Sequence, residues 1–476
     1  MKHEHLTSDV LILGAGGAGL RAAVEAAEKG AKVLVASKMG PDDINCTVSA
    51  WGGFTYAPEG REDELFRQVV ETGGYLNNQR LVEVFAHDTP RRMRELIDLG
   101  LDMEVLDDAD KKNQLGILKL RGKGRTTGFG MTRPLRARAE ALGAKFMDRV
   151  MISRLITNGR QVAGAVGVNL VDGSLLSIAA KAVVIAAGGG ACLYERTDNP
   201  AGATADGIAL AYEAGAELVD MECVSFQFPK DRVAQVFQVK QPPDEELLRK
   251  GTAHYFLGGI KIDERCCATL DGLYAAGETA GGLFGAARLG GAAMADIVVF
   301  GAIAGAEAAA WARGCASAEP DAAQADEERR RIEAMLSGRG EPTEDVAARV
   351  RSIMWRNCGA MKTHDTLTKA LDELDRLPDA VRVDSVAALR EGIECLNMRT
   401  VARRIAEASR LREETRGCFW RIDFPRPDNA KWVQNIHQWR SGGEAKCEVR
   451  PAVMTRLTSP GLPRIGAGCF SYLPQP

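Results

Sequence analysis

The sequence lacks the features of several classes of protein. Only 6% of its 476 residues are aromatic and the formal net charge is −3, so no positive excess favours nucleic acid or an anionic membrane. No apolar run approaches the roughly 20 residues of a membrane-spanning helix. The polar residues 1–8 lead into a predicted strand without a signal-peptide core. We therefore expect a cytoplasmic protein, peripheral to a membrane only through a partner.

Paired cysteines are also missing. The eleven cysteines are odd in number and scattered, and no Cys-x-x-Cys occurs. This pattern is typical of reduced thiols rather than of a disulfide framework. It predicts no metal site, iron–sulfur cluster or structural zinc in this chain. Any cluster that carries electrons is expected on another protein.

What the chain does contain begins with a glycine-rich turn between a strand and a helix. The apolar stretch 10–13 runs into a Gly-x-Gly-x-x-Gly spacing, then an Ala-rich helix from about 18 to 29 and a strand at 32–36. Such a turn places a pyrophosphate on a helix N-terminus. By itself it serves NAD, FAD or neither. After the second strand, Ser37 and Lys38 replace the usual ribose-binding acid, which disfavours a plain NAD site.

A second cluster lies about 260 residues downstream, where Gly277-Glu278 is followed by Arg288 and Gly291. It looks like the returning half of a two-part flavin site, and it therefore favours FAD. Between the clusters, short strands are expected from 150 to 187, the last ending at Ala187 and Gly188. A separate nucleotide site at that glycine turn is disfavoured, because no Gly-x-Gly-x-x-Gly helix follows it.

Further ordered motifs carry a family resemblance. They are Cys-Thr-Val-Ser-Ala-Trp-Gly-Gly at 46–53, Arg-Thr-Thr-Gly at 125–128, Asn-Pro with Thr-Ala-Asp-Gly at 199–207, Asp-Met-Glu at 220–222, His-x-x-x-Gly-Gly-Ile at 254–260 and Arg-x-Glu-x-Arg-Gly at 412–417. Together they resemble the flavoprotein subunits of succinate dehydrogenase and fumarate reductase, and L-aspartate oxidase.

This resemblance implies an α/β fold with a Rossmann-like FAD-binding domain in two parts, 1–229 and 254–315. A residual capping segment at 230–253 separates them. A C-terminal helical domain is expected at 316–440, followed by an extended tail at 441–476.

The resemblance also implies roles. Glu278 and Asp206 would contact FAD, and Arg288 would lie beside the flavin pyrimidine edge, where a guanidinium stabilises negative charge. His254 would face a substrate carboxylate or carbonyl, although a satisfied core histidine is the alternative. The candidate catalytic residues are Arg288, His254 and Gln227. The candidate cofactor-binding residues are Gly14, Gly16, Gly17, Ala18, Gly19, Ser37, Lys38, Cys46, Thr47, Ser49, Gly52, Gly53, Ala187, Gly188, Asp206, Gly277, Glu278, Arg288 and Gly291.

Three departures from the family pattern shape the expected function. Cys46 stands where covalently flavinylated members carry histidine, which excludes a histidyl–flavin bond; a packed thiol is favoured over a thioether, and so non-covalent FAD. Gln227 replaces a histidine and cannot carry positive charge. Only about two dozen residues replace the long capping domain, and none matches the proton-donating arginine. Arg232 is the best local substitute, although a solvated charge is favoured there.

The sequence thus predicts an FAD-dependent oxidoreductase subunit that transfers hydride at flavin N5 to or from an undetermined organic substrate. We expect a ferredoxin-like iron–sulfur or quinone-linked partner. Two alternatives stay open. One is a true fumarate reductase or succinate dehydrogenase flavoprotein subunit, and the other is a non-catalytic flavin electron-transfer subunit.

Overall fold

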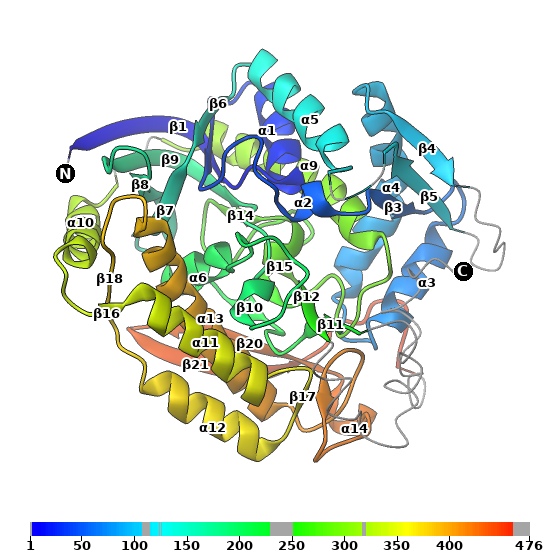
Figure 1. Cartoon of the computed structure of the whole chain (residues 1–476). Coiled ribbons are helices and arrows are strands. Elements are labelled where there is room, and N and C mark those ends of the chain that lie inside the picture. Colours follow the sequence, from blue (N-terminus) through cyan, green and yellow to red (C-terminus); the bar gives the residue numbers. More distant parts are fainter. Residues whose placement is uncertain are drawn as a thin grey trace.

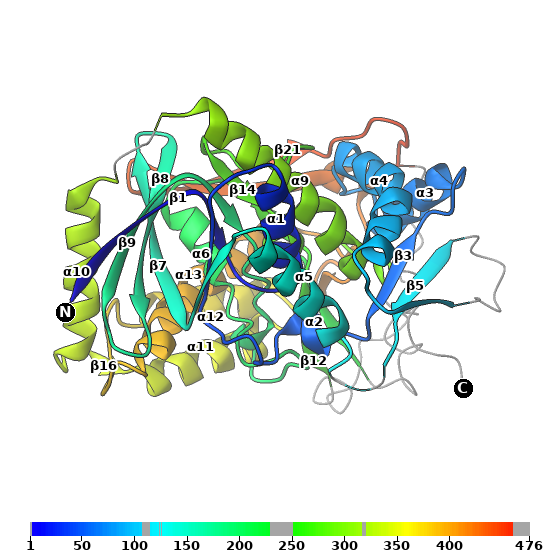
Figure 2. The same cartoon turned by 90° about the horizontal axis from the view of Figure 1, so that it is seen from above.

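A seven-stranded sheet supports the glycine-rich turn. The computed structural model describes residues 2–106, 115–122, 124, 126–228, 251–316 and 320–459. Strands β1, β2, β6, β9 and β14 run parallel, whereas β7 and β8 extend the sheet in antiparallel fashion beside β9 (Figures 1 and 2). The order is β6 (Lys145–Asp148), β2 (Val33–Ser37), β1 (His3–Leu13), β9 (Leu175–Ile185), β8 (Gln161–Asn169) and β7 (Val150–Asn158), with β14 (Leu273–Ala275) beside the end of β9.

Two helices from distant parts of the chain pack tightly together beside this sheet. They are α1 (Gly17–Glu28) and α9 (Ala292–Gly314). Their backbones approach closely because α9 presents glycines: a Cβ at Gly305 would lie 2.3 Å from the carbonyl oxygen of Ala22. This packing fastens the second part of the predicted FAD-binding domain to the first. A third helix, α5 (Phe129–Ala141), lies on the other side of α1 (Figure 2).

Helix α9 corrects one expectation, because by length and composition it could cross a membrane. Its most apolar window has a mean hydropathy of 1.6, yet 78% of that window is buried inside the fold. Asp296, Glu307 and Arg313 interrupt this helix, so its sequence does not stand out as an apolar run. The burial is typical of a core helix.

A three-stranded sheet and two helices form one end of the molecule. Helices α3 and α4 cover most of residues 62–98, and residues 103–106 form a strand. This strand pairs with β5 in a sheet whose order is β3–β5–β4. The elements are α2 (Cys46–Ser49), β3 (Gly53–Tyr56), α3 (Glu62–Thr72), α4 (Gln79–Asp98), β4 (Met103–Leu106) and β5 (Gly116–Leu120).

A second mixed sheet corrects the predicted C-terminal tail. Residues 441–451 belong to a hairpin of β20 and β21, and β20 pairs with β10. The boundary at 440 therefore cuts a strand, and only residues after 451 continue as a non-strand segment in the described part. The order is β15 (Ala280–Gly281), β13 (Gly259–Lys261), β10 (Leu218–Val219), β20 (Gln434–Ser441) and β21 (Glu444–Pro451).

The predicted capping segment is bounded by a two-stranded hairpin. Strand β11 (Val224–Gln227) pairs with β12 (Thr252–Phe256), so residues 252 and 253 belong to the body rather than to the cap. Arg232 lies outside the described residues.

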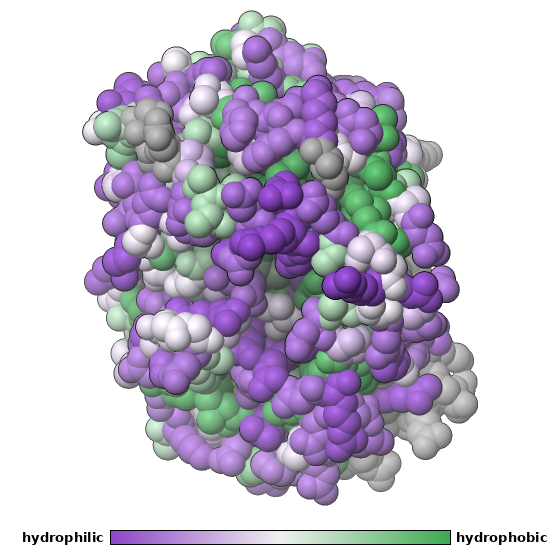
Figure 3. All heavy atoms as spheres, turned by 90° about the vertical axis from the view of Figure 1, so that its left-hand side faces the viewer, coloured by the Kyte–Doolittle hydropathy of each residue, from purple (hydrophilic) through white to green (hydrophobic). Residues whose placement is uncertain are grey.

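Helices dominate the C-terminal region, as predicted, and α13 packs on α6 of the first part. The face that carries α10 is mostly hydrophilic, with hydrophobic residues scattered over it (Figure 3). The remaining elements are η1 (Ala191–Leu193), α6 (Asp206–Glu213), η3 (Gly277–Thr279), α10 (Ala322–Leu336), β16 (Glu341–Pro342), α11 (Thr343–Asn357), β17 (Met361–Lys362), α12 (His364–Asp375), β18 (Val381–Arg382), α13 (Leu389–Leu411), β19 (Trp420–Arg421) and α14 (Asn429–Trp432).

Candidate active site

The two glycine clusters meet in space. A Cβ added at Gly277 would lie 3.0 Å from the Cβ of Ala18, and one at Gly17 would lie 2.4 Å from Cδ1 of Ile297 on α9. At Gly14, with φ of +107°, a Cβ would lie 2.4 Å from the carbonyl oxygen of Ala186. The turn can therefore pass between β9 and α1 only with glycine at these positions.

The loop at 46–53 joins this turn. Thr47 Oγ1 accepts a hydrogen bond from the Gly17 N–H at 3.0 Å. A Cβ at Gly128 would lie 1.9 Å from the Thr47 carbonyl oxygen, so the loop at 126–128 packs directly on α2. The ring of Trp51 lies against Gly53, and its nearest atom is 2.2 Å from the position that a Cβ of residue 53 would take. Ser49 bonds within the loop, its hydroxyl donating to the Cys46 carbonyl at 3.3 Å. The predicted loop residues thus lie together beside the turn.

Glu278 lies between the second glycine turn and β12. Its Oε1 accepts the N–H of Phe256 at 3.0 Å, and a Cβ at Gly189 would come within 2.0 Å of it. Burial raises the pKa of this carboxyl to about 7, although the Phe256 N–H and Arg288 act in the opposite direction. At Gly188, with φ of +78°, nothing lies within 4 Å of an added Cβ. Open space thus adjoins this turn.

These features fit FAD. Helix α1 begins at Gly17 directly after the turn, and its positive end suits a pyrophosphate. The space beside Gly188 and a half-buried carboxyl at Glu278 suit a ligand that carries hydroxyl groups. Gly291, the N-cap of α9, lies close to β3, since its carbonyl accepts the Thr55 N–H at 3.3 Å.

Two predicted cofactor-binding residues also bond to each other. Lys38 Nζ lies 2.5 Å from Asp206 Oδ2 and 2.6 Å from Glu394 Oε1 on α13. Asp206 Oδ1 accepts from Asn397 Nδ2 at 2.7 Å. Burial opposes ionisation of Asp206, but Lys38 and these hydrogen bonds outweigh it and lower the pKa of the carboxyl. Lys38 and Asp206 therefore fasten the helical domain to the sheet, and their contact with FAD stays a prediction. Ser37 Oγ accepts the Met39 N–H at 3.2 Å.

Arg288 is held over an aromatic ring. Its Cζ lies 4.5 Å from the centre of the Tyr255 ring, and Nη1 donates to the Leu289 carbonyl at 3.3 Å. Stacking on the ring orients a guanidinium without consuming its donors. Asp296 lies buried nearby, and burial raises the pKa of this carboxyl to about 8 in spite of Arg288. Tyr255 follows His254 on β12, so the ring on which Arg288 stacks lies one residue from His254 in this strand.

His254 has a partner that sequence reasoning missed. Its Nδ1 lies 2.9 Å from Oδ2 and 3.1 Å from Oδ1 of Asp198. Both side chains are 29% exposed, so His254 is neither a core histidine nor a free surface side chain. Asp198 directly precedes the Asn-Pro motif at 199–200, yet nothing in the local sequence connects it with a residue 56 positions away.

Gln227 is exposed at the end of β11, where it pairs with Thr252, two residues before His254. Residues 229–250, which come shortly after Gln227 in the chain, lie outside the described residues.

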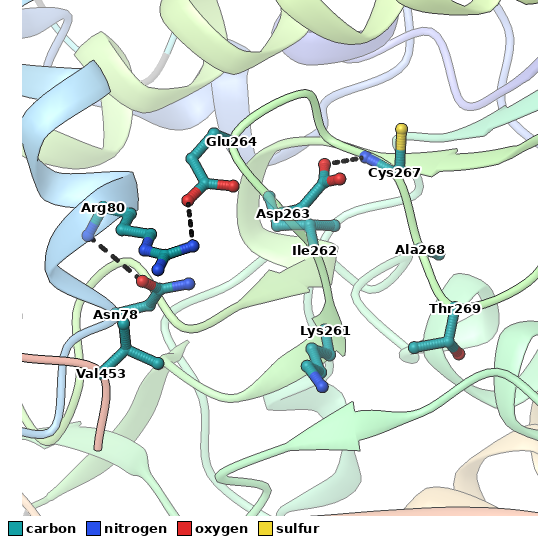
Figure 4. A pocket seen from close by; sticks show the side chains of 10 residues that line it. All are labelled: Asn78, Arg80, Lys261, Ile262, Asp263, Glu264, Cys267, Ala268, Thr269 and Val453. Carbon is teal, nitrogen blue, oxygen red and sulfur yellow. Dashed lines mark hydrogen bonds and ion pairs between the residues drawn. The ribbon is translucent and has the colours of Figure 1, made fainter.

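A cavity elsewhere does not match this chemistry. It has a volume of about 410 Å³ and is lined by Asn78, Lys261 and Glu264 among others. Its charges already have partners, since Arg80 lies 3.7 Å from Glu264 and Asp263 accepts the Cys267 N–H (Figure 4). None of the predicted site residues lines it.

Comparison with known proteins identifies the family. A model described as FAD binding domain matches residues 9–233 and 237–294, and one described as fumarate reductase flavoprotein C-term matches 347–464. The chain belongs to the fumarate reductase and succinate dehydrogenase flavoprotein family. It is an FAD-dependent oxidoreductase of that type, and FAD is its cofactor.

The relatives span nearly the whole chain. An uncharacterized FAD-dependent oxidoreductase of Methanocaldococcus jannaschii is 30% identical over 531 residues, covering 90% of this chain and 96% of the relative. A fumarate reductase (CoM/CoB) chain of Methanothermobacter marburgensis is 28% identical, with 92% of this chain and 98% of the relative covered. An alignment of 531 residues exceeds the 476 of this chain, so the Methanocaldococcus relative carries residues without a counterpart here.

Solved structures agree on the fold. Mycobacterium smegmatis Sdh1 in complex with UQ1 superposes with a TM-score of 0.84 at 25% identity, covering 96% of each chain. The FrdA chain of E. coli quinol fumarate reductase gives 0.84 at 24% identity, covering 97% of this chain and 99% of that one.

Proposed function

We propose that this chain is the flavin-bearing catalytic subunit of an oxidoreductase whose substrate is an organic molecule with a carboxylate or carbonyl group. Bound FAD supplies a centre that gives or accepts hydride. The observation that carries the proposal is the stacking of Arg288 on Tyr255, which follows His254 on β12, near the half-buried Glu278.

The side chains of this chain then have separable tasks. The Arg288 guanidinium, oriented on Tyr255, binds a substrate carboxylate or stabilises negative charge. The half-buried Glu278 holds hydroxyl groups of the cofactor. His254 orients the substrate and exchanges a proton with it.

A C4 dicarboxylate substrate fits this chain less well than it fits other members of the family. Gln227 offers no positive charge, and residues 228–251 are the whole connection between β11 and β12. So short a connection excludes less water from a small site than a full domain does. We therefore propose a substrate other than succinate or fumarate, or a second subunit that covers the site.

We further propose that the partner is an iron–sulfur or other electron-transfer subunit. Two observations support it: relatives are named as subunits, and the described residues contain no group of His, Cys, Asp or Glu that could hold a metal ion. Electrons thus need another carrier to leave or reach the flavin. We propose association with a membrane only through such a partner.

The test uses purified protein. Its absorption spectrum is recorded before and after acid precipitation. Anaerobic assays follow, with reduced viologen as electron donor for fumarate and a panel of unsaturated monocarboxylic acids, and with an oxidising dye of higher potential as electron acceptor for succinate. Released FAD, slow fumarate turnover and faster turnover of a monocarboxylate are expected. Fast fumarate reduction would instead support the second candidate, a true fumarate reductase subunit, which the Methanothermobacter relative favours. Redox-active flavin without turnover of any acid would indicate an electron-transfer subunit.

A further inference from the structure

We propose that Asp198 is a positioning residue that fixes the His254 ring, so that Nε2 is the nitrogen that exchanges a proton with substrate. This rests on the proposed function, in which His254 faces the substrate, and adds the device that orients it. It also gives this chain proton chemistry without the arginine that its family uses.

The backbone around the pair is tied in several places. Strand β12 is bridged at Ala253 to the loop that carries Asp198: the Ala253 N–H donates to the Arg196 carbonyl at 2.9 Å, and Thr197 Oγ1 donates to the Ala253 carbonyl at 2.8 Å. The two side chains therefore project from segments whose separation is set by main-chain contacts. This kind of support holds a functional side chain to a narrow geometry.

Asn199 links the pair to Cys46. Its Nδ2 donates to Asp198 Oδ1 at 2.9 Å and to the His254 carbonyl at 2.7 Å, while its Oδ1 accepts from Cys46 Sγ at 3.1 Å. Exchanging the amide oxygen and nitrogen would set Oδ1 against two other oxygens, so the network selects this orientation. Burial raises the pKa of the Cys46 thiol well above its usual value, which keeps it a donor.

The consequence for His254 is a defined tautomer. Asp198 stays ionised, because the hydrogen bonds from His254 and Asn199 outweigh the effect of burial and lower the pKa of its carboxyl. An ionised carboxylate only accepts, so Nδ1 carries a proton. Among the described residues, nothing hydrogen-bonds to Nε2. In neutral His254 the Nε2 lone pair is the base, and in the protonated ring the Nε2–H is the acid.

The proton step balances in both directions. When substrate is reduced, the Nε2–H bond breaks, its electron pair stays on Nε2, and the proton forms a new bond to the substrate atom that gains electron density. When substrate is oxidised, the Nε2 lone pair takes that proton back. The other titratable groups around the pair are Cys46, Glu278 and Arg288.

The tautomer can be observed without any substrate. In FAD-loaded protein with ¹⁵N-labelled histidine, the six histidines are resolved by NMR and His254 is assigned with the His254→Gln variant. We expect the Nδ1–H form in the natural protein and a shift toward the Nε2–H form in Asp198→Ala. Asp9→Ala is the matched control, since Asp9 is 32% exposed and pairs with Lys181. An Nε2–H ring in the natural protein, or no change in Asp198→Ala, would overturn the proposal.

A kinetic arm separates this proposal from the proposed function. With an acid that the panel shows to be reduced, we expect Asp198→Asn to lower kcat about 10²-fold with little change in KM. Asp9→Ala, the matched control, should retain kcat. An unchanged kcat in Asp198→Asn contradicts the role of Asp198. If no acid of the panel is reduced, the proposed function fails, and the tautomer still decides the role of Asp198.

Discussion

Two groups of charged side chains flank the β11–β12 hairpin and differ in burial. One group, which we call the sealed cluster, consists of Asp220, Glu222, Arg412, Glu414 and Arg416. Its side chains are 0–1% exposed. Asp198 and His254, the site pair, are each 29% exposed. The first group cannot meet a ligand, whereas the second leaves a ring nitrogen available.

The contacts explain the different uses. Arg412 Nε lies 2.7 Å from Glu222 Oε1 and Nη1 lies 2.9 Å from Glu414 Oε1, so one guanidinium joins the C-terminal segment to the end of the first part. Arg416 continues the cluster at 2.8 Å from Glu414 Oε2. A charged group that is buried away from water needs an oppositely charged partner, and the resulting ion pairs hold the segments of the chain in place. The partly exposed pair of Asp198 and His254 does not depend on further charged partners and can exchange a proton.

The largest effect on stability is expected from breaking the sealed cluster. Arg412→Ala leaves Glu222 buried without its cation and leaves Glu414 with Arg416 alone, and should lower the free energy of unfolding by about 3–5 kcal/mol. Denaturant unfolding followed by circular dichroism measures this. A loss below about 1 kcal/mol would show that the cluster is solvated and would remove the distinction drawn above.

The sealed cluster should also make stability depend on pH. Burial and the neighbouring Glu222 raise the pKa of Asp220 to about 7. A carboxyl whose pKa is raised by folding stabilises most below its unfolded pKa, near 4, and loses that contribution as the pH rises through 7. Between pH 5 and pH 7 the free energy of unfolding should therefore fall by about 1 kcal/mol per pH unit for this group.

Asp220→Asn tests this assignment, because asparagine tolerates the left-handed backbone found here, with φ of 52°. The variant should show a shallower pH slope in chemical denaturation at pH 5.5, 6.5 and 7.5. Glu278 and Asp296, whose pKa values are also raised, account for the slope that remains. An unchanged slope would assign the pH dependence to those two groups alone.

An ion pair at the surface should contribute much less to the free energy of unfolding than the sealed cluster does. Arg67 Nη1 lies 2.8 Å from Glu71 Oε2, and both side chains are 46% exposed. Water screens such a pair, so Arg67→Ala should change the free energy of unfolding by less than about 1 kcal/mol. The same denaturation experiment applies, and a loss equal to that of Arg412→Ala would mean that burial does not separate the two.

The smallest effect on stability is expected in the site pair. His254→Gln should leave the free energy of unfolding within about 0.5 kcal/mol, because the ring is half-buried and contributes little to packing. Turnover in the viologen-linked assay should nevertheless fall about 10²-fold. A strongly destabilised variant would mean that His254 belongs with the structural residues.

Local patterns in the sequence determined a good part of this protein. The apolar strand, the glycine spacing and the Ala-rich helix predicted β1, the turn and α1, because each depends on contacts between close neighbours. The later glycines and Arg288 pointed to FAD, and the helices after residue 316 showed in their composition. The shortened connection before His254 and the replacement of a histidine by Gln227 were also visible in the sequence.

Other features needed the tertiary structure, because they depend on contacts between residues far apart in the chain. Strand β20 forms where β10, more than 200 residues earlier, offers an edge for pairing, so the sequence alone placed its residues in the helical domain and those of β21 in the tail. Lys38 bonds to Asp206 and Glu394, although its place after β2 suggested a cofactor contact. The sequence does not distinguish Asp198 from other acidic residues in loops, and only folding places its Oδ2 2.9 Å from His254 Nδ1. The sequence by itself thus determined the cofactor and the local elements, whereas only the packing of distant segments decided which charges are sealed and which can react.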